Sequence, residues 1–171
     1  MNLFVPVGSS GRSGLLIDTN LLVLFTVGVV NRGRIENFKR TRQYTERDYD
    51  LLLRVLEKTA PLYTVAHVLA EVSNLIDLAG RERLQARHVL KEMLTILQEP
   101  QMSSLRASDS RPYEAHGLAD AAIAAIALEY NCSVLTDDLD LYLALGREGI
   151  SVINFTHLRA QEWGMTSARA R

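Results

Sequence analysis

The chain of 171 residues is short enough for one domain, and its 47% hydrophobic and 23% charged residues are ordinary for a globular protein. Its formal net charge of −1 does not indicate a nucleic-acid binder, so any such activity must depend on a local basic patch. The single cysteine, Cys132, excludes an internal disulfide, and without a membrane span or secretory signal we expect a cytoplasmic protein.

The N-terminal third is predicted to hold one buried strand and two helices. Residues 1–13 end in a Gly/Ser-rich stretch and are expected to form a flexible extension. A short apolar strand over 14–18 leads into a helix that starts at about Asn20. A polar, basic stretch follows, and then a helix that Thr45 is expected to cap and whose apolar stripe covers 51–56.

The rest of the chain repeats this alternation of short strands and helices. We predict strands at 62–65, 132–136 and 150–155, and helices at 66–79 (closed by Gly80), 81–98, 118–131 and 137–146. Residues 101–117 are expected to be irregular, and the tail over 159–171 to pack little apart from Trp163. The alternation predicts an α/β domain over 14–158, with a parallel sheet and helices on both faces.

Acidic residues stand at two strand ends and in two apolar helices. Asp18 follows the first strand directly, and Asp137 and Asp138 follow the third. Ligands of a parallel sheet bind beyond the carboxyl ends of its strands. Glu71 and Asp120 lie among apolar residues of the helices after the second strand and before the third. Gathered carboxylates repel one another unless a cation neutralises them, so this pattern indicates Mg²⁺ or Mn²⁺ and phosphoryl chemistry.

Four motifs together resemble the PIN domain in order and spacing: "LLIDTNLLVLF", "VAHVLAEVSNLI", "HGLADAAIAAIA" and "VLTDDLDLYLAL". The resemblance covers most of residues 14–157 and is to a VapC-type member of that ribonuclease family. It implies a three-layer α/β/α fold and a metal-dependent endoribonuclease that holds Mg²⁺ or Mn²⁺. The implied partners are RNA, a second copy of the chain and a small antitoxin protein, the chain being the toxin of a toxin–antitoxin pair.

Carried over position by position, the resemblance implies a catalytic, metal-binding set of Asp18, Glu71, Asp120 and Asp138. The fourth acid of the family lies two residues past a Thr or Ser, which from Thr136 selects Asp138 and leaves Asp137 as a surface residue. Asn20 and Thr136 match polar positions that orient the acids, and Asp140 is a candidate outer ligand.

Each acid also has a structural interpretation. Asp18 could be a helix N-cap, Asp120 could complement a helix dipole, and Glu71 could face solvent. The alternative function is a non-catalytic PIN-like module that binds RNA or regulates. A phosphatase of the haloacid-dehalogenase type is disfavoured, because Asn20 stands where that chemistry needs a second Asp.

The segment 31–47 is the one strongly basic part of the chain. It carries six basic and two acidic side chains, with Phe38 and Tyr44 between them. Basic and aromatic residues together suit single-stranded RNA, through phosphate contacts and base stacking. An ordinary solvated loop explains the composition equally well.

Overall fold

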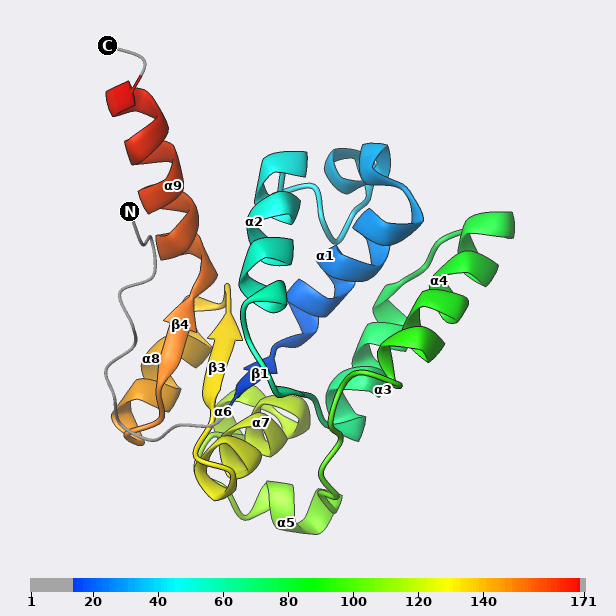
Figure 1. The fold of residues 1–171 in the computed structure, drawn as a ribbon. Helices are drawn as coiled ribbons and strands as arrows, with labels where there is room; N and C mark the ends of the chain where they lie inside the picture. Colours follow the sequence, from blue (N-terminus) through cyan, green and yellow to red (C-terminus); the bar gives the residue numbers. More distant parts are fainter. Residues whose placement is uncertain (1–13, 170–171) are drawn as a thin grey trace.

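A parallel sheet lies at the centre of the computed structural model, which describes residues 14–169 and their side chains as far as residue 164. Its four strands run in the order β2-β1-β3-β4. They are β1 (Leu15–Ile17), β2 (Leu62–Tyr63), β3 (Ser133–Thr136) and β4 (Val152–Asn154). Helices flank the sheet, so the predicted α/β class is confirmed (Figure 1). The extension predicted for residues 1–13 lies outside the described residues.

The helices follow the strands in the predicted alternation. They are α1 (Thr19–Val30), the 3₁₀ helix η1 (Arg32–Asn37), α2 (Glu46–Glu57), α3 (Ala66–Leu75), α4 (Gly80–Met93), α5 (Ser104–Ser108), α6 (Tyr113–His116), α7 (Leu118–Glu129), α8 (Leu139–Arg147) and α9 (Phe155–Arg169). Within the described part of the chain, none of them is both long and apolar enough to cross a membrane.

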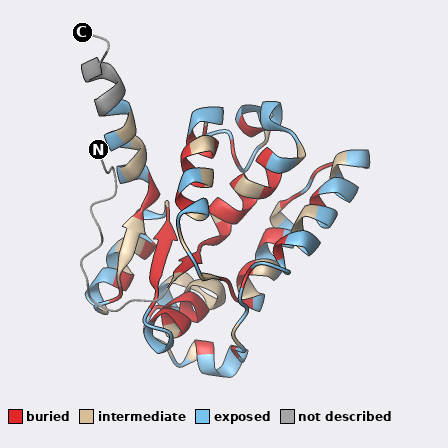
Figure 2. Cartoon of the chain, viewed as in Figure 1, coloured by how far each residue is buried: buried red, intermediate tan, exposed pale blue. Residues whose placement is uncertain are grey.

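Helix α1 is the central helix of the domain. It contacts η1, α2, α3 and α4, and most of its apolar side chains are buried against these neighbours. Figure 2 shows it as buried along most of its length. A Cβ at Gly28 would lie 2.3 Å from the ring of Tyr49 on α2, so only glycine permits this approach of the two helices.

The start of α2 confirms the predicted cap. The Thr45 hydroxyl accepts the Asp48 N–H at 3.3 Å, and the Asp48 carboxylate accepts the Thr45 N–H at 2.8 Å, which completes a capping box. Leu51, Leu52 and Val55 of the predicted stripe are buried against the core.

The structure corrects three of the predicted elements. Gly80 begins α4 rather than closing α3, which already ends at Leu75. Helix α4 in turn ends at Met93, because Gln98 pairs with β2 by donating its N–H to the Leu62 carbonyl at 2.8 Å. The stretch predicted to be irregular, 101–117, contains the short helices α5 and α6.

A further correction concerns the predicted tail. Residues 155–169 form α9, although their sequence has no continuous apolar stripe. The helix is held by Arg159, which donates to the Asp48 carboxylate at 2.8 Å and to the Gln43 carbonyl at 3.1 Å. Polar contacts of this kind leave no hydrophobic periodicity, so the sequence pattern did not indicate them.

Candidate catalytic site

Asp18 is a buried carboxylate at the carboxyl end of β1, beside the end of β3. Its side chain is 4% exposed, and it accepts the Thr136 hydroxyl at 2.6 Å and the Thr19 N–H at 2.5 Å. The residue is the N-cap of α1, so the structural interpretation is correct as far as it goes. Burial, with repulsion from Asp120 and Asp137, nevertheless raises the pKa of Asp18 to about 7. A helix cap at the surface would not carry this electrostatic cost, so capping alone does not explain the residue.

Glu71 reaches the same place from α3. The Thr19 hydroxyl donates to Glu71 Oε2 at 2.8 Å and so joins residues 52 positions apart. Asp120, in the first turn of α7, is half-buried. Burial, followed by repulsion from Asp138 and then Glu71, raises the pKa of Asp120 to about 7. Asp120 is therefore close enough to Asp138 and Glu71 for their charges to act on it.

Asp138 is the N-cap of α8, at the carboxyl end of β3. Its Oδ1 accepts the Leu141 N–H at 3.0 Å, and its own N–H donates to the Thr136 hydroxyl at 3.0 Å. Thr136 therefore joins the turn that carries Asp138 to the buried Asp18. The structure thus brings the four predicted acids to one edge of the sheet. Asp140, the candidate outer ligand, is exposed in the first turn of α8.

Asp137 was expected at the surface, and the structure corrects this. The residue is half-buried, its Oδ1 accepts the Asn20 amide at 3.2 Å, and its Oδ2 accepts the Tyr44 hydroxyl. It also lies close enough to Asp18 to raise the pKa of that residue. Tyr44 is 93 positions away in the chain, and no local signal at either residue indicates the contact.

The chemistry of the acids fits a hard divalent cation. All four candidates are carboxylates, the ligand type that Mg²⁺ and Mn²⁺ prefer, and two of them resist ionisation in the absence of a neutralising charge. Among residues 14–164, no three His, Cys, Asp or Glu side chains are arranged closely enough to hold an ion together. Mg²⁺ commonly binds through one or two carboxylates and keeps several waters, so a set of three is not needed to hold it.

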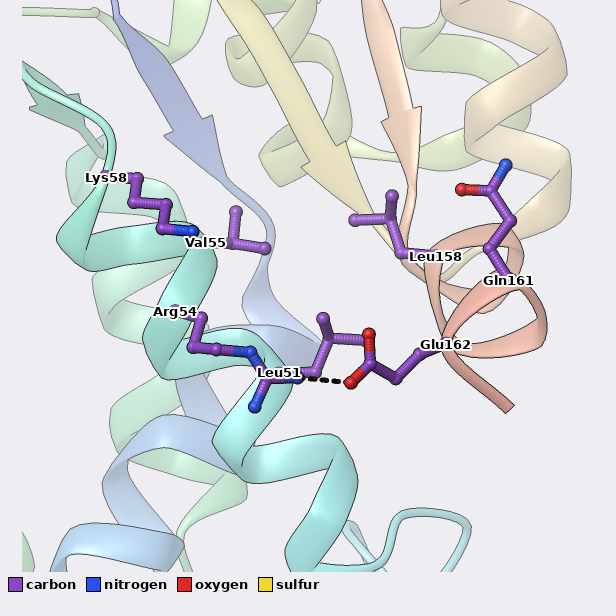
Figure 3. Close-up of a pocket in the computed structure, with 7 residues that line it drawn as sticks. All are labelled: Leu51, Arg54, Val55, Lys58, Leu158, Gln161 and Glu162. Carbon is purple, nitrogen blue, oxygen red and sulfur yellow. Dashed lines mark hydrogen bonds and ion pairs between the residues drawn. The ribbon is translucent and has the colours of Figure 1, made fainter. Parts of the chain in front are cut away.

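A separate pocket of about 130 Å³ lies between α2 and α9. Figure 3 shows its lining residues, Leu51, Arg54, Val55, Lys58, Leu158, Gln161 and Glu162. An ion pair of 2.9 Å between Arg54 and Glu162 joins the two helices there. None of the acids at the sheet edge lines this pocket, so it is not part of the candidate site.

The basic segment 31–47 is only partly available to a ligand. Arg32 pairs with Asp50 and, at 3.5 Å, with Glu46, while Arg34 pairs with Glu82 at 2.9 Å. Four exposed cations of the segment form no ion pair with any described residue, and we call them the cation patch: Lys39, Arg40, Arg42 and Arg47.

The two aromatic residues of this segment do not match the expected stacking role. Tyr44 is 1% exposed, and Phe38 is half-buried and packs against the core. Burial and the nearby Asp137 raise the pKa of the Tyr44 hydroxyl, so it stays protonated and donates its hydrogen bond. The stacking part of the RNA-binding prediction is therefore wrong for Tyr44, and phosphate contacts remain open to the cation patch.

Comparison with known proteins bears out the resemblance to the PIN domain. The family model for the PIN domain matches residues 15–144. No curated protein matches the chain. Among solved structures, it is similar to that of FitAB bound to an IR36 DNA fragment, at 17% identity and a TM-score of 0.49, with 82% of this chain and 94% of that chain covered. We draw no functional conclusion from a likeness this distant.

Proposed function

The chain belongs to the PIN domain family, whose members are generally nucleases that use divalent metal ions, and from that premise we propose a specific activity. The protein is a Mg²⁺- or Mn²⁺-dependent endoribonuclease that hydrolyses RNA phosphodiester bonds. The observation that supports this is the meeting of Asp18, Glu71, Asp120 and Asp138, from four separate segments, at the carboxyl edge of the sheet.

The four acids lie at different depths in the fold, and we assign their roles accordingly. Asp18 is the most deeply buried of the four acids, so we assign it to the inner side of the ion. Glu71 and Asp138 are exposed, so they lie on the side from which RNA approaches. The cation, when bound, supplies an activated water and stabilises the charge that develops on the phosphate oxygens.

Two threonines keep the acids in place. Thr136 donates to Asp18 while it accepts the N–H of Asp138, and Thr19 donates to Glu71. Groups that orient metal ligands commonly change metal affinity or activity by about 10- to 100-fold when they are removed. The cation patch supplies the phosphate contacts that position RNA, since phosphate binding needs only exposed positive charge.

The finer part of the proposal is that the chain acts as a VapC-type toxin. A small antitoxin would then be its partner and would inhibit it by inserting an Arg or Lys side chain among the acids. A second copy of the chain is also a proposed partner. Purification with the neighbouring gene products tests this, and recovery of the chain without any small partner argues against the toxin role.

The competing function is a non-catalytic module that binds RNA or regulates. Such a module gains nothing from clustered carboxylates, which destabilise the fold when no cation is bound. Retention of all four acids therefore favours catalysis.

The deciding experiment measures Mn²⁺ binding by calorimetry and RNA cleavage for the wild type and for Asp18→Asn. The matched control is Asp77→Asn, because the Asp77 side chain is 89% exposed and its ion pair is with Arg83, not with any of the four acids. We expect Asp18→Asn alone to lose both binding and cleavage. A wild type that binds RNA without cutting it in Mn²⁺ or Mg²⁺ supports the non-catalytic alternative.

A further inference from the structure

Three polar side chains from distant segments meet at the turn after β3. Asn20 comes from the first turn of α1, Tyr44 from the loop before α2, and Asp137 from the turn itself. Asn20 donates to Asp137 Oδ1 at 3.2 Å, and Tyr44 donates to Asp137 Oδ2. With a donor on each oxygen, the plane of this carboxylate is held from two sides.

These hydrogen bonds join the two turns that carry candidate metal ligands. Asn20 lies two residues after Asp18, and Asp137 lies directly before Asp138. The distance between the two turns therefore depends on whether Asp137 stays in its present orientation. Because Asn20 supplies only one of the two donors, the Tyr44 hydroxyl completes the restraint.

Tyr44 is itself held firmly by the far end of the chain. Its ring packs edge-on against Phe155 at 6.4 Å, and the Arg159 guanidinium lies 5.4 Å from its centre. Arg159 also donates to the carbonyl of Gln43, the residue before Tyr44, and to the buried Asp48. Helix α9 thus fixes the position of the tyrosine that restrains Asp137.

We propose that Tyr44 is a positioning residue for the acids at the carboxyl edge of the sheet. It acts through Asp137 to set the spacing between Asp18 and Asp138. The inference rests on the proposed nuclease function and adds to it a role for the loop before α2 and for α9. We assign Asp137 an orienting role, because its hydrogen bonds to Asn20 and Tyr44 link the turn before Asp138 to the first turn of α1 and to the loop before α2.

The test compares Tyr44→Phe with Tyr49→Phe in the full chain. Tyr49 is a matched control because it is also a buried tyrosine, but its ring contacts Gly28 and Arg32 rather than the acids. Three quantities are measured: the Mn²⁺ dissociation constant by calorimetry, kcat and KM for RNA, and the melting temperature in EDTA.

We expect Tyr44→Phe to weaken Mn²⁺ binding or to lower kcat by about 10- to 100-fold, the usual effect of removing a group that orients a metal ligand. KM for RNA should stay within about twofold, because the phosphate contacts are unchanged. Tyr49→Phe should match the wild type in both binding and turnover. A merely structural role of Tyr44 would instead lower the melting temperature and leave the Mn²⁺ dissociation constant of the folded protein unchanged.

A double-mutant cycle with Asp137→Asn tests whether Tyr44 acts through Asp137. If it does, the double variant should bind Mn²⁺ as tightly as Asp137→Asn alone. If instead the losses of Mn²⁺ affinity in the two single variants multiply in the double variant, the proposal is overturned. Asp137→Asn alone carries the test if Tyr44→Phe does not fold, with the same expected loss. Unchanged binding and turnover in Tyr44→Phe refute the inference alone, whereas a wild type that neither binds Mn²⁺ nor cuts RNA refutes the proposed function and the inference with it.

Discussion

Replacement of Asp18 by Asn should stabilise the metal-free protein while it removes activity. The pKa of Asp18 is about 7 in the fold, against an ordinary value of 3.8. Between these two values the unfolded chain is ionised and the folded chain is protonated, so the folded state binds more protons. Stability therefore falls as the pH rises from about 4 to 7, and it levels off above the folded pKa.

The magnitude follows from the size of the shift. Each pKa unit corresponds to about 1.4 kcal/mol, so about three units cost the wild type about 4 kcal/mol at about pH 8 and roughly 2 kcal/mol at about pH 5. Asparagine keeps the size of the side chain but turns a donor toward Thr136, at a cost of about 1 kcal/mol. We expect Asp18→Asn to be more stable than the wild type by about 3 kcal/mol at about pH 8, and by about 1 kcal/mol at about pH 5.

Urea denaturation in EDTA at the two pH values measures these differences, with Asp77→Asn as a control whose stability should track that of the wild type. Saturating Mn²⁺ should narrow the gap, because a cation at about 100 times its dissociation constant stabilises only the wild type, by about 3 kcal/mol. The reasoning is refuted if Asp18→Asn is less stable than the wild type at both pH values, or if its advantage does not grow with pH.

Three further changes test other parts of the structure. Arg159→Ala leaves the Asp48 carboxylate buried without its charged partner and should destabilise the fold by about 3–5 kcal/mol in urea denaturation. Adding Asp48→Asn should restore part of the lost stability, and a destabilisation below about 1 kcal/mol by Arg159→Ala would contradict the contact. Gly28→Ala places a methyl group against the Tyr49 ring and should cost about 1–3 kcal/mol by thermal unfolding, so an unchanged melting temperature would show that the helices can separate freely. Alanine at all four positions of the cation patch should raise KM for RNA and leave kcat nearly unchanged. The slope of log K for RNA binding against log salt concentration should become shallower by up to about 3, at about 0.7 per lost single-strand phosphate contact, and an unchanged slope would show that RNA binds elsewhere.

Local features of the sequence determined much of the architecture. The apolar strands were identified because buried parallel strands are continuous apolar runs, and the start of α2 because Thr45 is a favoured N-cap before an apolar stripe. The acids at the strand ends were apparent for a similar reason, since an acid after an apolar run is unusual on its own. Glu71 and Asp120 were noticed through their apolar neighbours, and the family resemblance then selected four of these acids as one metal-binding set.

Other features were decided only by tertiary packing. The end of α4 before Gln98, the burial of Tyr44 and the helix at 155–169 each involve partners far away in the chain. Arg159 meets Asp48 across 111 positions, and Tyr44 meets Asp137 across 93. Capping and hydrophobic periodicity act over a few residues, so they carry no information on which polar side chains meet when α2 and α9 pack beside the sheet. For that reason the sequence by itself indicated the acids and, through the family resemblance, Asn20 and Thr136 as residues that orient them. Only the folded chain showed the contacts of Thr19 with Glu71 and of Tyr44 with Asp137.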